Sequence, residues 1–219
     1  MPAVSPTAFR GWPPEALDFL RELEDDNDRD WFKANRARYD EHLVAPALAL
    51  AEELSDFGRP HLFRPWNDTR FRPGPPIKEH LGLAIGYGGA GGYYVELSLD
   101  GLLVAAGMHM PARDQLERLR RGIDAPRTSA ALTRAIERAR QAGLALNEPE
   151  LVRAPRGYPA DHPRLDLLRH RRLTVARRHE LRPWLHRPQA EARIREGLAA
   201  ASPLVRWLRR HVGPSQLSR

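Results

Sequence analysis

The sequence predicts an α+β fold, in which a small antiparallel sheet built around a central hairpin packs with helices from both the N-terminal and the C-terminal parts of the chain. First, apolar and polar side chains alternate through residues 91–110 on both sides of Asp100-Gly101, a dipeptide suited to a two-residue type I′ turn. Second, residues 80–87 alternate in the same way and predict a third strand. Third, the stretches on both sides of the sheet repeat apolar residues every three or four positions, which is typical of amphipathic helices.

The predicted hairpin assigns the neighbouring side chains to two faces. A turn at Asp100-Gly101 pairs Leu97 with Val104, and side chains alternate along each strand. The face predicted to be core consists of Tyr93, Val95, Leu97, Leu99, Leu102, Val104, Ala106 and Met108. The connection GGAGG at 88–92 is too glycine-rich to pack and is predicted to be mobile.

The opposite face carries Tyr94 and Glu96, with His109 at its edge. Its remaining positions are small: Gly82, Ala84, Gly86, Ala105 and Gly107. Small residues on a sheet allow another backbone or a ligand to come close. This face is therefore expected to hold either a tightly packed helix or the floor of a pocket whose polar groups are Glu96 and His109.

Before the sheet, residues 1–12 are expected to be loosely ordered. Pro13-Pro14 predicts the start of a helix, whose apolar side chains include Leu17, Leu20 and Leu23. Asp28 is expected to cap a second helix. Pro46 is expected to kink or restart that helix, which then continues to Gly58.

After the sheet, the periodicity predicts helices over 111–125 and 128–142, the second capped by Thr128 or Ser129. One or two short strands are expected within 144–154, a short helix capped by Asp161 over 164–171, and a strand over 173–178. The final helix, over 189–211, is expected to be interrupted at Ser202-Pro203. One domain comprising residues 1–219 is the simplest account, since no linker or repeat divides the chain.

Composition excludes several classes of site. The 219 residues contain no cysteine, which excludes disulfides, thiolate metal sites and cysteine nucleophiles. The nine histidines show no zinc-binding spacing, so no metal site is predicted. GYGGAG at 86–91 matches a dinucleotide fingerprint by letter, but a strand follows it where a helix is required, and no cofactor is identified. No membrane span or signal peptide is recognised, which favours a soluble cytoplasmic protein.

Charge is distributed unevenly along the chain. Residues 1–110 hold 11 Lys and Arg against 17 Asp and Glu, whereas residues 111–219 hold 24 against 11. The basic half either pairs with the acidic half within the fold or faces a polyanion. Trp184 or Trp207 would then be available to stack on bases, although arginines at helical spacing are also typical of a solvated surface.

Five stretches occur in the order expected of one protein family: 19–46, 67–86, 91–111, 119–123 and 155–175. Together they resemble the DUF2461 proteins, an uncharacterised bacterial family. The resemblance implies an α+β fold and, because the family has no established activity, no reaction. Its most recognisable segment is matched by Asp68, Thr69, Arg70, Phe71 and Lys78. The segment between Phe71 and Lys78 departs from the family pattern, with RPGPP in place of charged residues and Ile77 in place of a tyrosine.

Two groups of residues are candidate sites. Asp68, Arg70 and Lys78 are suited to an anion site, in which arginine and lysine bind a phosphate or carboxylate and Asp68 orients the arginine. The alternative is a structural ion pair between Asp68 and either cation. Glu96 and His109 are candidates for an acid–base pair or two metal ligands, and the alternative is a histidine that only packs and hydrogen-bonds.

Three functions stay open at this point. The first is binding of an anionic small molecule in a pocket over the sheet by Arg70 and Lys78, with Tyr94, Glu96 and His109 nearby; no catalytic group is identified, so an enzymatic role is neither predicted nor excluded. The second is association with nucleic acid through the arginine-rich half. The third is a structural or partner-binding domain without a ligand. The sequence does not predict the oligomeric state.

Overall fold

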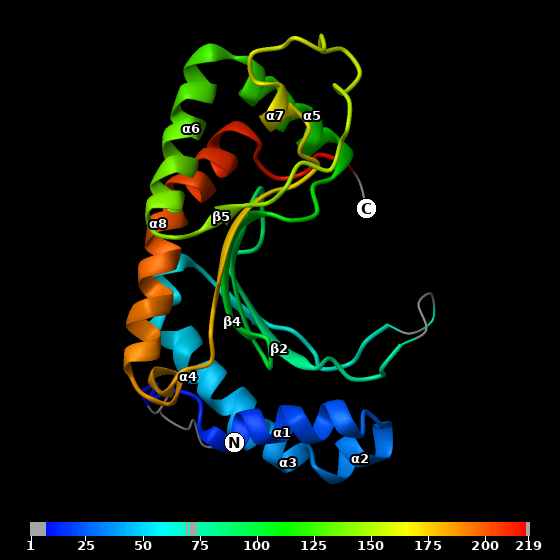
Figure 1. The fold of residues 1–219 in the computed structure, drawn as a ribbon, viewed down its shortest axis with the longest axis vertical. Coiled ribbons are helices and arrows are strands. Elements are labelled where there is room, and N and C mark those ends of the chain that lie inside the picture. The colour runs from blue at the N-terminus through cyan, green and yellow to red at the C-terminus, as the bar shows by residue number, and fades with distance from the viewer. Residues whose placement is uncertain (1–7, 69, 71–73, 218–219) are drawn as a thin grey trace. The chain divides into compact units, whose positions relative to one another are not determined.

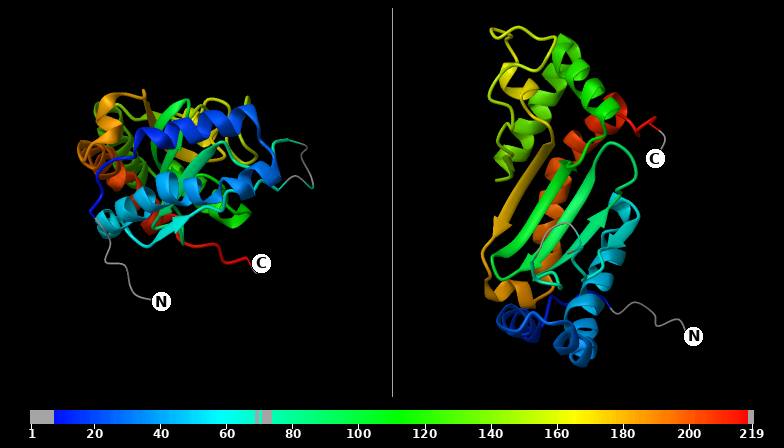
Figure 2. Two further views of the ribbon diagram at one scale, coloured as in Figure 1. Left: turned by 90° about the horizontal axis from the view of Figure 1, so that it is seen from below. Right: turned by 90° about the vertical axis from the view of Figure 1, so that its right-hand side faces the viewer.

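The computed structural model of the protein describes residues 8–68, 70 and 74–217 and confirms the α+β class (Figure 1, Figure 2). In this part of the chain one antiparallel sheet comprises β1 (Pro60–Leu62), β2 (His80–Ile85), β3 (Gly92–Ser98), β4 (Gly101–Met108), β5 (Ala145–Leu146) and β6 (Leu173–His179). Their order across the sheet is β1-β2-β3-β4-β6-β5. The α-helices are α1 (Pro14–Asp25), α2 (Arg29–Ala34), α3 (Arg36–Tyr39), α4 (Ala45–Glu53), α5 (Arg113–Asp124), α6 (Pro126–Gln141), α7 (Leu165–Leu168) and α8 (Gln189–His211).

The chain divides into two compact units. The first unit comprises Met1–Ile85, Tyr94–Val104 and Arg178–Arg195, and the second comprises Gly86–Tyr93, Ala105–Arg177 and Glu196–Arg219. Each unit takes three separate stretches of the chain, so no single boundary in the sequence could mark the division. The expectation of one domain over 1–219 rested on the absence of such a boundary.

The first two helices of the first unit begin where the sequence predicts, whereas the break at Asn35 between α2 and α3 was not predicted. α1 starts at Pro14, where proline fits the first helical turn, and it lies beside α3 (Figure 1). The Asp28 carboxylate caps α2 by accepting hydrogen bonds from the backbone N–H groups of Asp30 and Trp31. A π-helical turn at Asp40–Val44 precedes α4. The change in helical geometry therefore falls just before Pro46, which has no N–H to donate.

The segment before α1 is packed, contrary to the expectation of a loosely ordered start. Phe9 and Trp12 are almost completely buried, and their rings meet edge to face at 5.2 Å. The backbone N–H of Trp12 donates to the Leu185 carbonyl at 3.1 Å. Burial of two large aromatic side chains offsets the entropy of ordering this segment. Residues 1–7 of the same expectation lie outside the described residues.

The alternation of the hairpin is confirmed, but its turn is not the predicted one. Val95 and Val104 are both buried, as are the other predicted core residues of β3 and β4, whereas Leu99 is only half-buried. The turn residues are Leu99 and Asp100, and strand β4 already begins at Gly101. Among the described residues only glycines have positive φ, so Asp100 does not adopt the type I′ geometry.

Gly101 is required instead by the neighbouring strand. Its φ is +131°, and a Cβ built on it would lie 2.3 Å from the backbone oxygen of His179 in β6. The sequence therefore pointed correctly to a position that requires glycine. The reason it suggested, a type I′ turn, is wrong. Close approach of β6, which is distant in sequence, decides that a side chain cannot occur there.

Three further expectations are corrected in the second unit. α6 begins at Pro126, so Ser129 lies inside the helix and neither it nor Thr128 is the N-cap. α7 has Arg164 as its N-cap, with no side-chain capping bond, so Asp161 does not cap it. The GGAGG connection packs in part, because Ala90 is completely buried, whereas Gly88 and Gly89 are exposed with open space around them.

The last helix, α8, runs through Pro203 without interruption. The Ser202 hydroxyl, next to the proline, donates to the Leu198 carbonyl at 3.0 Å. A helix tolerates an internal proline when packing holds it on both sides of the lost hydrogen bond. Leu204 and Leu208, which follow the proline, are completely buried.

Candidate functional site

Tyr94 and Glu96 form a polar group on the first unit. The Tyr94 hydroxyl donates to Glu96 Oε2 at 2.9 Å. The Arg178 guanidinium bonds to both Glu96 Oε1 at 3.3 Å and Ser98 Oγ at 3.1 Å. Burial, together with the negative charge of Glu96, raises the pKa of the Tyr94 hydroxyl above its usual range. Tyr94 is therefore protonated at neutral pH, and its hydroxyl donates its hydrogen bond to Glu96.

The side chain of Tyr94 explains why residue 82, in the adjacent strand, is a glycine. A Cβ added to Gly82 would lie 2.6 Å from the Tyr94 hydroxyl oxygen. At this position the predicted close approach is real, but the group that approaches is a side chain of the adjacent strand rather than a helix or a ligand. His80 Nε2 lies 3.9 Å from Glu96 Oε2 and is a further polar neighbour of the carboxylate.

Asp68 and Arg70 form the ion pair that was the alternative to an anion site. Arg70 Nε and Nη2 donate to the two carboxylate oxygens of Asp68 at 2.9 and 2.7 Å. Both side chains are well exposed, and they lie in a loop rather than on a strand. Lys78 Nζ donates to the Arg64 carbonyl at 2.6 Å, and burial lowers its pKa. Thr69 and Phe71, the remaining members of this segment, lie outside the described residues.

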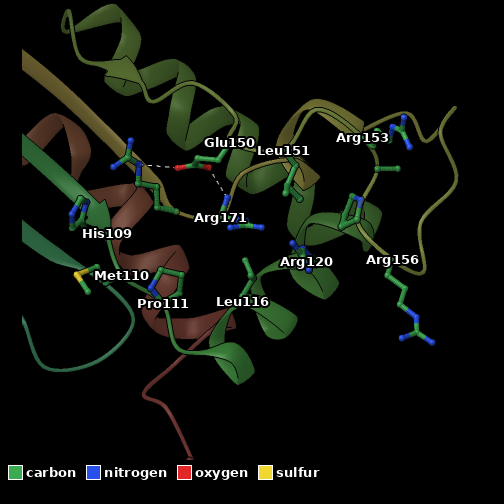
Figure 3. Close-up of a pocket in the computed structure, with 13 residues that line it drawn as sticks. His109, Met110, Pro111, Leu116, Arg120, Glu150, Leu151, Arg153, Arg156 and Arg171 are labelled. Atoms are coloured by element: carbon green, nitrogen blue, oxygen red, sulfur yellow. Dashed lines mark hydrogen bonds and ion pairs between the residues drawn. The ribbon is translucent and has the colours of Figure 1, made fainter. Parts of the chain in front are cut away.

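His109 lines an open cavity of about 910 Å³ in the second unit (Figure 3). The cavity is strongly basic, and its arginines are Arg120, Arg153, Arg156, Arg171 and Arg172. Its apolar lining is Met110, Pro111, Leu116, Leu151, Ala154 and Pro155. Glu150 contributes the one carboxylate among these lining residues. Since His109 follows strand β4, the end of this strand leads directly into the cavity wall.

Glu150 binds two of the cavity's basic residues. Its Oε1 atom lies 2.8 Å from Arg172 Nε in an ion pair, without the alignment of a hydrogen bond. Its Oε2 atom accepts the backbone N–H of Arg171 at 2.7 Å. The carboxylate therefore neutralises Arg172, while it holds only the backbone of Arg171 and leaves that guanidinium for another partner.

Arg120 and Arg171 point into the same part of the cavity (Figure 3). Burial lowers the pKa of Arg120, and the positive charge of Arg171 acts in the same direction, whereas Tyr158 and Glu117 act to raise it. Arg120 Nε is buried without a hydrogen-bond partner. Within residues 8–68, 70 and 74–217, neither guanidinium forms an ion pair with a carboxylate. Two like charges that converge without an acid between them disfavour each other, and an anion in the cavity would remove that penalty.

Glu96 and His109, predicted as a pair, belong to different units. Glu96 belongs to the first unit, where its partners are Tyr94 and Arg178, and His109 belongs to the second unit, where it lines the basic cavity. Arg70, Lys78 and Glu96 also have different partners from one another.

Sequence reasoning missed the cavity arginines because it grouped them with a generally basic half. A local signal was present for one of them: Arg120 follows Leu116 by four positions, and residues four apart share a helix face. Leu116 is half-buried and lines the cavity, and Arg120 emerges beside it. Nothing local could have indicated Arg171, because its approach depends on the fold.

A histidine outside the cavity has a structural role. His162 Nε2 lies 3.0 Å from Asp124 Oδ1, and His162 Nδ1 accepts the backbone N–H of Arg164 at 3.1 Å. Both ring nitrogens are therefore used in holding the loop before α7. In the described part of the chain, no three histidine or acidic side chains gather in a way that could hold a metal ion.

The comparisons with known proteins identify one family. Residues 15–207 match the family model described as "Conserved hypothetical protein (DUF2461)", so the match extends through both units. No curated protein and no solved structure matches the chain. Among the helices of the described residues, none is long and apolar enough to span a membrane.

Proposed function

The chain belongs to the DUF2461 family, and we propose that it binds an anionic small molecule, carrying a phosphate or carboxylate group, in the basic cavity of the second unit. The observation that carries the proposal is the convergence of Arg120 and Arg171 without an acidic partner in the described residues (Figure 3). Arginine presents a planar fork of donors that matches phosphate and carboxylate oxygens.

Arg120 is partly desolvated: its Nε atom is buried without a hydrogen-bond partner, and burial disfavours the charged form of a guanidinium. An anion that accepts from the terminal nitrogens of Arg120 and Arg171 would give both groups a charged partner and offset the repulsion between them. The volume of about 910 Å³ is that of a small-molecule site.

The proposal moves the anion site away from Arg70 and Lys78. Those two cations already have partners within their own loop, namely the Asp68 carboxylate and the Arg64 carbonyl. The cavity arginines are better suited, because burial and convergence raise the strength of an electrostatic contact. No side chain of the cavity is assigned a catalytic role.

Thermal unfolding with inorganic phosphate tests the proposal. At constant ionic strength, set with sodium chloride, phosphate at about ten times its Kd is expected to raise Tm by about 3–6 °C. The double variant Arg120→Gln with Arg171→Gln should lose this rise. Arg138→Gln is the matched control, because Arg138 is an exposed arginine of the same unit that does not line the cavity. An equal rise in all three proteins would refute the assignment of the site.

The same variants separate the proposal from binding of nucleic acid. Affinity for a single-stranded oligonucleotide that falls steeply with salt, and that survives the loss of Arg120 and Arg171, would favour nucleic-acid binding by the basic surface as a whole.

Without any anion, Arg171→Gln should leave Tm unchanged or raise it slightly, since it removes a like charge from the neighbourhood of Arg120.

A further inference from the structure

We propose that the cavity selects an anion with one charged head and an apolar body, that is, an organic phosphate or carboxylate, over inorganic anions and polyphosphates. This inference rests on the proposed function, because it concerns the ligand of the same cavity. Three features carry it: the position of the apolar wall, the rigidity of that wall, and the small number of guanidinium groups that remain for the head.

The apolar wall adjoins the charged end of the cavity. Leu116 lies one helical turn before Arg120 on α5, so the two side chains emerge on the same helix face. Pro111 and Leu151 line the cavity beside them, as the close-up shows (Figure 3). When the charged head of a ligand lies between Arg120 and Arg171, the rest of the ligand contacts this apolar wall. Removal of apolar surface from water then favours binding.

Leu151, the part of the apolar wall contributed by a loop, is held in place by Arg169, which does not line the cavity. The Leu151 N–H donates to the Arg169 carbonyl at 3.0 Å, and the Leu151 carbonyl accepts a hydrogen bond from Arg169 Nε. Arg169 is thus occupied in fixing the backbone of Leu151. A wall that is already ordered loses little entropy when a ligand binds, which strengthens apolar selectivity.

The charged end offers few donors for a longer anion. Glu150 neutralises Arg172, and Arg153 and Arg156 point away from Arg120 and Arg171 (Figure 3). Two guanidinium groups are then left for the head, which suits one phosphate or carboxylate. A polyphosphate would place its further charges against Leu116 and Leu151, where they would lose water without gaining partners.

Titration calorimetry on the full chain with inorganic phosphate, phenyl phosphate and pyrophosphate tests this inference. Phenyl phosphate is expected to bind about tenfold more tightly than inorganic phosphate, from burial of the ring. Pyrophosphate should bind more weakly than phenyl phosphate. Leu116→Ala should reduce the preference for phenyl phosphate several-fold and leave the affinity for inorganic phosphate unchanged, and Leu151→Ala serves as a second variant. Leu217→Ala is the control, because Leu217 is an exposed leucine of the same unit outside the cavity lining.

The outcomes distinguish this inference from the proposed function. Equal affinity for inorganic and phenyl phosphate, or tighter binding of pyrophosphate, would overturn the inference while an anion site dependent on Arg120 remained. A preference for phenyl phosphate that Leu116→Ala and Leu151→Ala both leave intact would also overturn it. If none of the three anions binds in a manner that depends on Arg120, the proposed function itself fails.

Discussion

Gly107 provides a sharp test of the way in which β4 and β6 approach each other. Its φ is +132°, and a Cβ built on it would lie 2.2 Å from the Leu173 oxygen and 2.7 Å from the Thr174 Cα, both of which are backbone atoms. Such a backbone conformation costs a residue other than glycine about 1–3 kcal/mol, and forced overlap in a packed region costs about 1–3 kcal/mol more. We therefore expect Gly107→Ala to lower the free energy of unfolding by about 4 kcal/mol.

Two other glycines of the second unit separate the two contributions. Gly157 also has positive φ, +92°, but nothing lies within 4 Å of its added Cβ; Gly157→Ala should therefore cost only about 1–2 kcal/mol. Gly88 has open space and no positive φ, so Gly88→Ala should be neutral or stabilise by up to about 1 kcal/mol.

Urea unfolding followed by tryptophan fluorescence measures the series, with the midpoint and the slope fitted for each variant. A loss of about 4 kcal/mol is a large part of the 5–15 kcal/mol that ordinary domains possess. The reasoning would be refuted if the free energies of unfolding of Gly107→Ala and Gly157→Ala differed by less than about 1 kcal/mol, since the backbone overlap would then contribute nothing.

Because Gly107 lies just before His109, the same variant is also expected to weaken anion binding in the cavity.

Three further predictions follow from hydrogen bonds. Tyr94→Phe removes the donor to Glu96 and should shift the urea midpoint by the equivalent of about 1–2 kcal/mol. Hydrogen bonds, above all from the backbone N–H of Gln216, lower the pKa of Asp114 from 3.8 to about 2. The ionised Asp114 carboxylate therefore stabilises the folded protein fully above pH 3.8, and this contribution is lost as the pH falls through about 2. The protection of amides near the C-terminus, measured against the intrinsic exchange rate at each pH, should fall over that window in the parent protein and be already low, without this pH step, in Asp114→Asn. Trp207→Phe loses an indole hydrogen bond of 2.8 Å to a backbone carbonyl and leaves a small cavity, and should cost about 2–3 kcal/mol by the same unfolding assay; no change would show that this buried contact is not maintained in solution.

The sequence by itself determined the α+β class, the core face of the hairpin and the starts of α1 and α2. These features depend on local chemistry: alternation in a strand places Val95 and Val104 together, proline fits the start of a helix, and the Asp28 carboxylate reaches the nearest free N–H groups. The family resemblance was confirmed by the match over residues 15–207, although it carried no reaction with it.

The tertiary structure alone decided why Gly101 and Gly107 are glycines, since the atoms that would collide with a side chain belong to β6. It also brought Arg120 near Arg171 and placed Glu96 and His109 in different units. Contacts between residues far apart in sequence leave no periodic signal, because neither partner is constrained by its own neighbours along the chain. The cavity consists of such contacts, and for that reason the sequence predicted the sheet but not the cavity.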